Sequence, residues 1–127
     1  MGRNTYDVGL TLDPYPYPGK QVLVLSKSRS GTDQNGATYV DREPFDVVHE
    51  LRGQPGGDIW LVGGGLAIRS FLAAGLIDDL DLFLHPILLG DGLSLFPHGF
   101  PETALELAST EPFASGLVRL SYRRPAG

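Results

Sequence analysis

Short apolar runs separated by turn residues divide the first half of the chain into strand-like and helix-like segments. Residues 21–28 (QVLVLSKS) and 37–41 (ATYVD) are short runs rich in valine and leucine or aromatic residues, and turn-forming loops precede them, which is typical of strands. Residues 44–53 (PFDVVHELRG) begin with proline and end with glycine. Their apolar side chains recur at helical spacing, at Phe45, Val47, Val48 and Leu51. This segment is therefore predicted to be a helix.

The middle of the chain continues the same alternation. Residues 58–63 (DIWLVG) are almost continuously apolar, a pattern that favours a strand buried on both faces of an α/β sheet, with Trp60 in the core. Residues 65–74 carry one apolar stripe, which predicts a helix. Gly75 follows at the position where a left-handed C-terminal cap is expected.

The last third of the chain predicts three further strands. Residues 80–90 (LDLFLHPILLG) form an apolar run in which Pro86 indicates a bulge or a sheet edge, because proline has no N–H to donate. Residues 105–110 and 117–124 alternate apolar and polar positions, which favours an antiparallel hairpin with one solvated face. Residues 1–127 are thus expected to form a single α/β domain, with a mostly parallel mixed sheet and a C-terminal antiparallel hairpin.

Composition limits the classes of partner. The chain has 127 residues, a formal charge of −5, and scattered lysines and arginines, so a nucleic-acid partner is not expected, since phosphate binding needs a clustered basic face. It has no cysteine, which removes disulfides and thiolate chemistry and fits a reducing, cytoplasmic location. No apolar run is long enough for a membrane span or a signal peptide.

Three consecutive glycines, Gly63 to Gly65, lie between the predicted strand at 58–63 and the predicted helix at 65–74. They could serve only to relieve crowding in a tight turn, or they could admit an anion to the amides of the helix N-terminus. The dinucleotide pattern G-x-G-x-x-G has Ile68 in its third place and lacks the expected later acidic residue. The P-loop pattern fails because no lysine follows the glycines.

The wider pattern from Ile59 to Phe96 resembles a known family. An apolar strand ends in glycines, a helix ends at Gly75 and Leu76, an acidic pair precedes the next strand, and P-x-x-x-G-x-G-x-x-LF follows. This arrangement resembles the reductase domain of riboflavin biosynthesis and its bacterial relatives in the dihydrofolate reductase superfamily. The opening MGRNTY resembles the family's G-R-x-T segment, and VLSKS resembles its phosphate-binding strand exit.

The resemblance implies a dihydrofolate reductase-like three-layer α/β fold that binds NADPH. It implies that the pyrophosphate lies on the backbone at the glycine turn, with a cis peptide between Gly63 and Gly64. The 2′-phosphate is expected at the strand exit, although Lys27 and Arg29 by themselves also fit a solvated loop. The implied cofactor-binding residues are Gly2, Arg3, Thr5, Ser26, Lys27, Gly63, Gly64, Gly65 and Leu66.

Other conspicuous side chains have simpler interpretations. The three histidines, at 49, 85 and 98, share no metal-ligand spacing, so no metal site is expected. Asp78, Asp79 and Asp81 lie between a predicted helix end and a predicted strand, where solvated structural acids are common. No catalytic residue is assigned.

The implied reaction is hydride transfer from NADPH to a small pteridine or pyrimidine-like heterocycle, such as dihydrofolate or the 5-amino-6-ribosylaminouracil phosphate of riboflavin synthesis, in a homodimer. In complete members the proton donor lies in a first strand and helix that precede the MGR segment. This chain starts at MGR, so it is expected to lack the central strand, either because Met1 is internal to a longer product or because a short form repairs its sheet by dimerising.

Two other functions stay open. One is a non-catalytic nucleotide-binding or structural module that keeps the fold without a complete substrate site. The other is an unrelated α/β binding protein in which the glycines are only steric.

Overall fold

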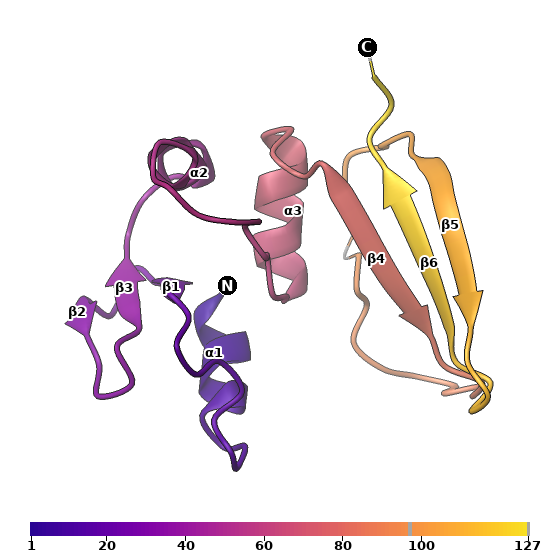
Figure 1. The fold of residues 1–127 in the computed structure, drawn as a ribbon, viewed down its shortest axis with the longest axis horizontal. Helices are drawn as coiled ribbons and strands as arrows, with labels where there is room; N and C mark the ends of the chain where they lie inside the picture. Colours follow the sequence, from indigo (N-terminus) through magenta and orange to yellow (C-terminus); the bar gives the residue numbers. More distant parts are fainter. Residues whose placement is uncertain (97, 127) are drawn as a thin grey trace.

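The structure is a computed structural model, and it describes residues 1–96 and 98–126. The described residues form a mixed α/β arrangement of three helices and six strands in two small sheets (Figure 1). In chain order the elements are α1 (Arg3–Gly9), β1 (Leu23–Leu25), β2 (Gly31–Thr32), β3 (Thr38–Val40), α2 (Pro44–Arg52), α3 (Gly65–Ala73), β4 (Asp79–Leu84), β5 (Glu106–Pro112) and β6 (Val118–Arg123).

The N-terminal sheet has the strand order β1-β3-β2 and holds the main core. β1 pairs with β3 in parallel, β2 pairs with β3 in antiparallel, and Gly2 forms a parallel bridge with Leu25 at the outer edge of β1. The buried side chains that pack together here are Tyr6, Val22, Val24 and Ala37. Tyr6 belongs to α1. This core therefore fixes α1 against β1, the strand that precedes the predicted phosphate-binding residues Ser26 and Lys27.

The C-terminal sheet has the strand order β4-β6-β5 and is antiparallel throughout. One face carries ion pairs from Arg119 to Glu111 (3.7 Å) and from Arg123 to Asp79 (3.4 Å). The predicted hairpin with a solvated face is therefore confirmed. None of the residues of β4, β5 and β6 is fully buried, so the opposite, apolar face lacks a complete cover.

The predicted helices are confirmed with their ends. α2 ends at Arg52 with Gly53 as its C-cap, and α3 ends at Ala73. Gly75 has a φ of +66°, the left-handed conformation that glycine adopts without steric cost. Pro44 at the start of α2, and Gly53 and Gly75 after the two helices, account for these ends, because proline and glycine act on the backbone conformation at their own positions.

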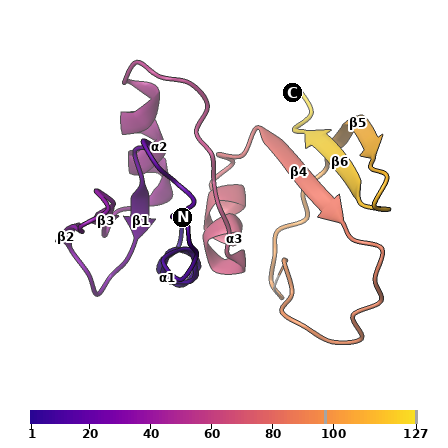
Figure 2. The same ribbon diagram turned by 60° about the horizontal axis from the view of Figure 1, so that its bottom comes forward.

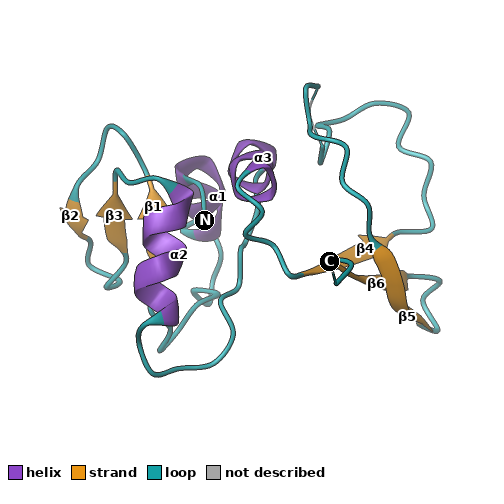
Figure 3. Ribbon diagram, turned by 90° about the horizontal axis from the view of Figure 1, so that it is seen from above, coloured by secondary structure: helices purple, strands orange, loops and turns teal. Residues whose placement is uncertain are grey.

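The predicted strand at residues 58–63 is wrong for this structure. The segment forms no strand, and Trp60, expected in the core, is 76% exposed. A strand exists only where a neighbour supplies hydrogen-bond partners, and among the described residues none lies alongside this segment in register. Figure 3 shows the connection between α2 and α3 passing between the two sheets as a loop.

The missing pairing also changes the sheet. Instead of one mostly parallel mixed sheet, the described residues form two separate sheets, in which β1 and β3 are the parallel pair. The strand predicted at 80–90 ends at Leu84, two residues before Pro86, which could not have donated to the ladder. In the part of the chain that the structure describes, no helix has the length and apolar character needed to cross a membrane.

Candidate nucleotide-binding site

The N-termini of α1 and α3 lie side by side, as Figures 1 and 2 show. The Gly2 amide donates to the Gly63 carbonyl (3.3 Å), and a Cβ on Gly2 would lie 3.8 Å from the Cβ of Ala67. Gly2 is the N-cap residue of α1 and Gly64 is the N-cap residue of α3, and neither helix has a side-chain cap. The glycines therefore allow two helix starts to meet closely.

The amides of both first turns lack backbone acceptors within residues 1–96 and 98–126. In α3 the first helical bond runs from the Ile68 amide to the Gly64 carbonyl (3.0 Å), and in α1 the first runs from Tyr6 to Gly2 (3.1 Å). Neither first turn contains an acidic side chain. Two helix N-termini with free amides and no carboxylate create a positive electrostatic potential, which favours an anion.

Thr5 closes the space around Gly63 and Gly64. A Cβ on Gly64 would lie 3.2 Å from the Thr5 Oγ1, and one on Gly63 would lie 3.8 Å from the same atom. Gly64 has a φ of −79°, which other residues adopt, so the close approach of Thr5 is what favours glycine there. The expected cis peptide between Gly63 and Gly64 is confirmed. Leu66, the next predicted contact, is exposed in the first turn of α3.

A turn organised by Ser26 follows β1. The buried Ser26 Oγ accepts hydrogen bonds from the backbone amides of Ser28 (3.3 Å) and Arg29 (3.0 Å). Lys27 is exposed. Ser26 thus shapes the loop through its hydroxyl, and Lys27 projects from the same loop.

Two arginines from different elements meet beside this turn. Arg3 of α1 donates to the Ser28 Oγ (2.9 Å), and Arg29 forms an ion pair with Asp7 of α1 (2.7 Å). The Arg29 guanidinium also lies over the Tyr39 ring, 5.7 Å from its centroid. Hydrogen bonds to Tyr39 and to Asp7 raise the pKa of Arg29 above its ordinary value, so the guanidinium stays protonated and positively charged.

The α1 helix is anchored by a buried tyrosine. The Tyr6 hydroxyl donates to Asp33 Oδ2 (2.6 Å), while Asp33 Oδ1 accepts from the amides of Asn35 (2.9 Å) and Ala37 (3.0 Å). The bond from Tyr6 lowers the pKa of Asp33, and burial, followed by the bond to Asp33, raises the pKa of Tyr6. α1 is thereby tied to the β2–β3 hairpin.

The structure groups the predicted residues into two neighbouring clusters. The first, the glycine cradle, consists of Gly2, Thr5 and residues 63–66. The second, the basic turn, consists of Arg3 and residues 26–29, and Arg3 joins the two because it follows Gly2 directly. The sequence does not predict that Ser28 and Asp7 contact the arginines of the basic turn. A basic residue directly after a strand indicates the basic turn itself, but the pairing of Asp7 with Arg29 depends on tertiary structure.

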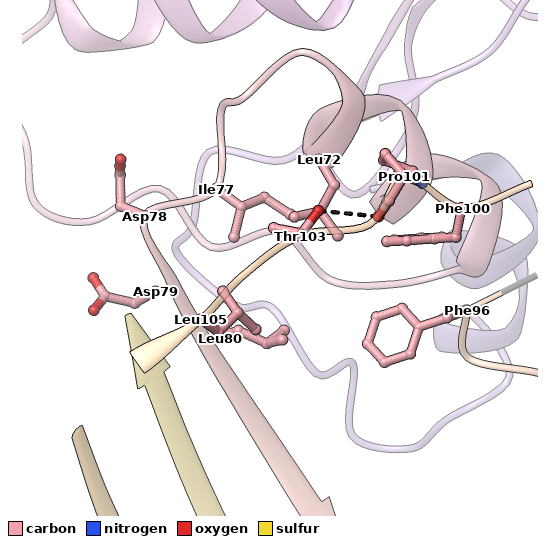
Figure 4. Close-up of a pocket in the computed structure, with 10 residues that line it drawn as sticks. All are labelled: Leu72, Ile77, Asp78, Asp79, Leu80, Phe96, Phe100, Pro101, Thr103 and Leu105. Carbon is pink, nitrogen blue, oxygen red and sulfur yellow. Dashed lines mark hydrogen bonds between the residues drawn. The ribbon is translucent and has the colours of Figure 1, made fainter. Parts of the chain in front are cut away.

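An apolar cleft lies at the opposite end of α3 (Figure 4). It has a volume of about 290 Å³ and includes the rings of Phe96 and Phe100, whose centroids are 5.0 Å apart. Its walls are Leu72, Ile77, Asp78, Asp79, Leu80, Phe96, Phe100, Pro101, Thr103 and Leu105. Because the nine residues of α3 span about 13 Å, this cleft is separate from the glycine cradle.

The three aspartates near this cleft have structural partners, as expected. Asp78 pairs with Arg52 (2.8 Å), Asp79 pairs with Arg123 (3.4 Å), and Asp81 accepts from Ser121. No three histidine or carboxylate side chains within residues 1–96 and 98–126 gather as a metal-binding group.

Comparison with known proteins places the chain in a family. Residues 21–119 match the model of the RibD C-terminal domain. Two Bacillus subtilis (strain 168) proteins, both described as uncharacterized, are similar in sequence. YyaP is 35% identical over 103 residues, which are 81% of this chain and 54% of YyaP. YwjB is 30% identical over 125 residues, which are 98% of this chain and 71% of YwjB. The chain therefore spans about half the length of YyaP.

Two solved structures are also similar. A protein of Shewanella sp. PV-4, described as a putative riboflavin biosynthesis protein, matches with a TM-score of 0.86 and 30% identity over 99% of this chain and 72% of its own. A pyrimidine reductase-like protein of Corynebacterium diphtheriae matches with a TM-score of 0.54 and 20% identity over 83% of this chain and 50% of its own. The second match supports the fold alone. Since the family model covers most of the chain, this protein belongs to the RibD C-terminal domain family.

Proposed function

We propose that this chain binds NADPH and serves the reductase chemistry suggested by its family, the reduction of a small pteridine or pyrimidine-like heterocycle. The observation that carries the proposal is the meeting of two helix N-termini at the glycine cradle. Free amides of both first turns point to an anion site, and the absence of acidic side chains in those turns leaves their positive potential intact.

The cradle fits a pyrophosphate. Gly63 and Gly64 bring no side chain to the cradle, and the Thr5 hydroxyl, whose Oγ1 lies 3.2 Å from where a Gly64 Cβ would stand, would donate a hydrogen bond to a phosphate oxygen there. Residues Gly2, Arg3, Thr5 and Gly63 to Leu66 would hold the pyrophosphate. Two adjacent dipoles suit a doubly charged group better than a single carboxylate.

The basic turn fits the 2′-phosphate that distinguishes NADPH from NADH. Arg3 and Arg29 present two guanidinium groups, and Asp7 holds Arg29 in place. Lys27 adds an exposed ammonium group on the same loop. Arginine forms strong charge-assisted bonds to phosphate, so the basic turn would select NADPH.

NADPH, when bound, supplies the hydride. The residues of this chain bind and orient it: the cradle fixes the middle of the dinucleotide and the basic turn fixes its adenosine end. A nucleotide-binding module without turnover is the second candidate. It is favoured by the exposed Trp60 and the unpaired segment beside the cradle, because they leave the neighbourhood of the site incomplete. Loss of NADPH absorbance with dihydrofolate or 5-amino-6-ribosylaminouracil phosphate would distinguish the two.

The cofactor assignment is tested by calorimetric titration of NADPH and NADH into the wild-type protein and two glycine variants. Gly64→Ala places a methyl group against Thr5 and inside the cradle, so NADPH binding is expected to be lost. Gly57→Ala is the matched control, because its Cβ would meet nothing within 4 Å. Equal NADPH affinity in all three proteins, or no preference of the wild type for NADPH over NADH, would contradict the assignment.

A further inference from the structure

Two adjoining clefts form one groove at the C-terminal end of α3. The apolar cleft of Figure 4 has a volume of about 290 Å³, and a second cleft beside it has a volume of about 360 Å³. The loop after α3 and the segment 100–105 contribute to both clefts. Five residues line both of them, which makes the groove continuous: Leu72, Ile77, Pro101, Thr103 and Leu105.

One end of the groove is apolar and has room for an aromatic molecule. The rings of Phe96 and Phe100 lie there edge to face, with their centroids 5.0 Å apart, and Leu80 lines the same cleft (Figure 4). A cavity of roughly 150 Å³ holds a benzene molecule. A cleft of about 290 Å³ is therefore large enough for a pair of fused aromatic rings.

The other end of the groove contains an arginine that the fold holds in place. Arg124 directly follows β6, and its backbone amide donates to the Asp78 carbonyl (2.9 Å). Its guanidinium donates to the Gly75 carbonyl, just beyond the end of α3, and lines the second cleft. A Cβ on Gly75 would lie 2.9 Å from Nη1 of Arg124. The absence of a side chain at Gly75 therefore leaves the space that this guanidinium occupies.

Arg124 has hydrogen-bond donors available for a ligand. A guanidinium has five N–H donors, and the Gly75 carbonyl accepts from one of its nitrogens. In the part of the chain that the structure describes, Arg124 forms no ion pair with a carboxylate. An arginine without a carboxylate partner, beside an apolar cleft, is suited to bind the carboxylate of an apolar molecule.

The acidic side chains around the groove do not cancel this charge. Asp78 forms an ion pair with Arg52 (2.8 Å). Asp79 forms an ion pair with Arg123 (3.4 Å). Glu102 lines the second cleft with Arg124, and it would repel a bound carboxylate. The charge of Glu102 therefore gives a way to test the sign of the ligand.

We propose that this groove binds a small aromatic carboxylic acid, with its carboxylate on Arg124 and its rings in the apolar cleft beside Phe96 and Phe100. A mostly apolar pocket with a few polar groups that fix the orientation of the ligand is typical of small-molecule sites. The groove lies at the opposite end of α3 from the glycine cradle, so this proposal does not depend on the cofactor assignment.

The test compares 2-naphthylacetate with its uncharged analogue 2-naphthaleneethanol by calorimetric titration into the wild type and Arg124→Gln. The wild type is expected to bind the carboxylate about fivefold more tightly than the alcohol, the effect of one solvent-screened charge pair. Arg124→Gln is expected to lose this preference and to bind the alcohol as the wild type does. In the ¹⁵N-labelled wild type, the carboxylate is expected to shift the amides of Leu72, Ile77 and Leu105.

Arg69→Gln is the matched control. Arg69 is also exposed, donates to a backbone carbonyl, that of His98 (3.5 Å), and lines neither cleft. Its replacement is expected to leave both affinities unchanged. Arg124→Lys keeps the charge and is expected to retain the preference for the carboxylate, which separates binding from any loss of stability when the bond to Gly75 is removed. Melting temperatures are measured for every variant.

Glu102→Gln is expected to bind 2-naphthylacetate more tightly, because it removes a negative charge from the same cleft. Weaker binding by this variant would mean that the groove recognises a cation and would overturn the proposal. The proposal is also overturned if the wild type binds neither compound at millimolar concentration, if Arg124→Gln keeps the preference for the carboxylate, or if the amide shifts lie away from the groove.

Discussion

Replacing Arg29 with glutamine isolates the contribution of the basic turn to nucleotide selection. The variant removes a charge-assisted bond to a 2′-phosphate, which is among the stronger hydrogen bonds in proteins. The Arg29 side chain is 45% exposed, so solvent screening weakens that bond. The Kd for NADPH is therefore expected to be roughly 5–30-fold higher. The Kd for NADH is expected to be unchanged, since NADH lacks the 2′-phosphate.

Arg52 provides a matched control for Arg29. It forms an ion pair of nearly the same length, 2.8 Å to Asp78 compared with 2.7 Å from Arg29 to Asp7, and its side chain is 54% exposed. Arg52→Gln therefore removes a similar surface ion pair far along the chain from the basic turn. Calorimetric titration of both nucleotides into both variants measures the effect. Equal weakening of NADPH and NADH by Arg29→Gln, or the same loss in Arg52→Gln, would refute the assigned role.

Three further predictions concern the residues around the site. Tyr6→Phe removes the buried bond to Asp33 and is expected to cost about 1–2 kcal/mol in urea unfolding at pH 7. Because the pKa of Asp33 is lowered in the fold, its contribution is complete above the unfolded value of about 3.9 and is lost as pH falls below it. The wild type should therefore lose more stability than Tyr6→Phe between pH 5 and pH 2, and equal losses would contradict this. Ser26→Ala leaves two amides without their acceptor and is expected to cost about 1–3 kcal/mol of unfolding free energy. Lys27→Gln, at an exposed side chain, is expected to leave the melting temperature unchanged and to weaken NADPH binding alone, so a lower melting temperature would contradict the assigned role.

The helices were predictable from sequence because their signals are local. Proline at the start of α2 and glycine after both α2 and α3 determine where these helices begin and end. The glycine cradle was predictable for the same reason, since the glycines, the helix start and the G-R-x-T segment are each contiguous in sequence. The structure brings these residues together, and their role in binding a cofactor stays a prediction.

The predictions that fail concern segments whose structure depends on residues far away in the sequence. The segment containing Trp60 has the composition of a buried strand, but composition cannot supply the neighbour that a strand requires. The basic turn was predicted in part, because Ser26 and Lys27 follow a strand. Asp7 lies 22 positions from Arg29 in sequence, and no local pattern predicts that it holds this arginine.

The central claim is that the amides at the two helix N-termini bind the pyrophosphate of NADPH. Titration of NADPH into the ¹⁵N-labelled protein, followed by amide chemical shifts, tests it most directly. We predict the largest shifts at Arg3, Gly64, Gly65 and Leu66, whose amides have no backbone acceptor within the described residues, with smaller shifts at residues 26–29 that are absent when NADH is used. Shifts confined to other parts of the chain, such as the cleft at Phe96 and Phe100, or no shifts at millimolar NADPH, would contradict the claim.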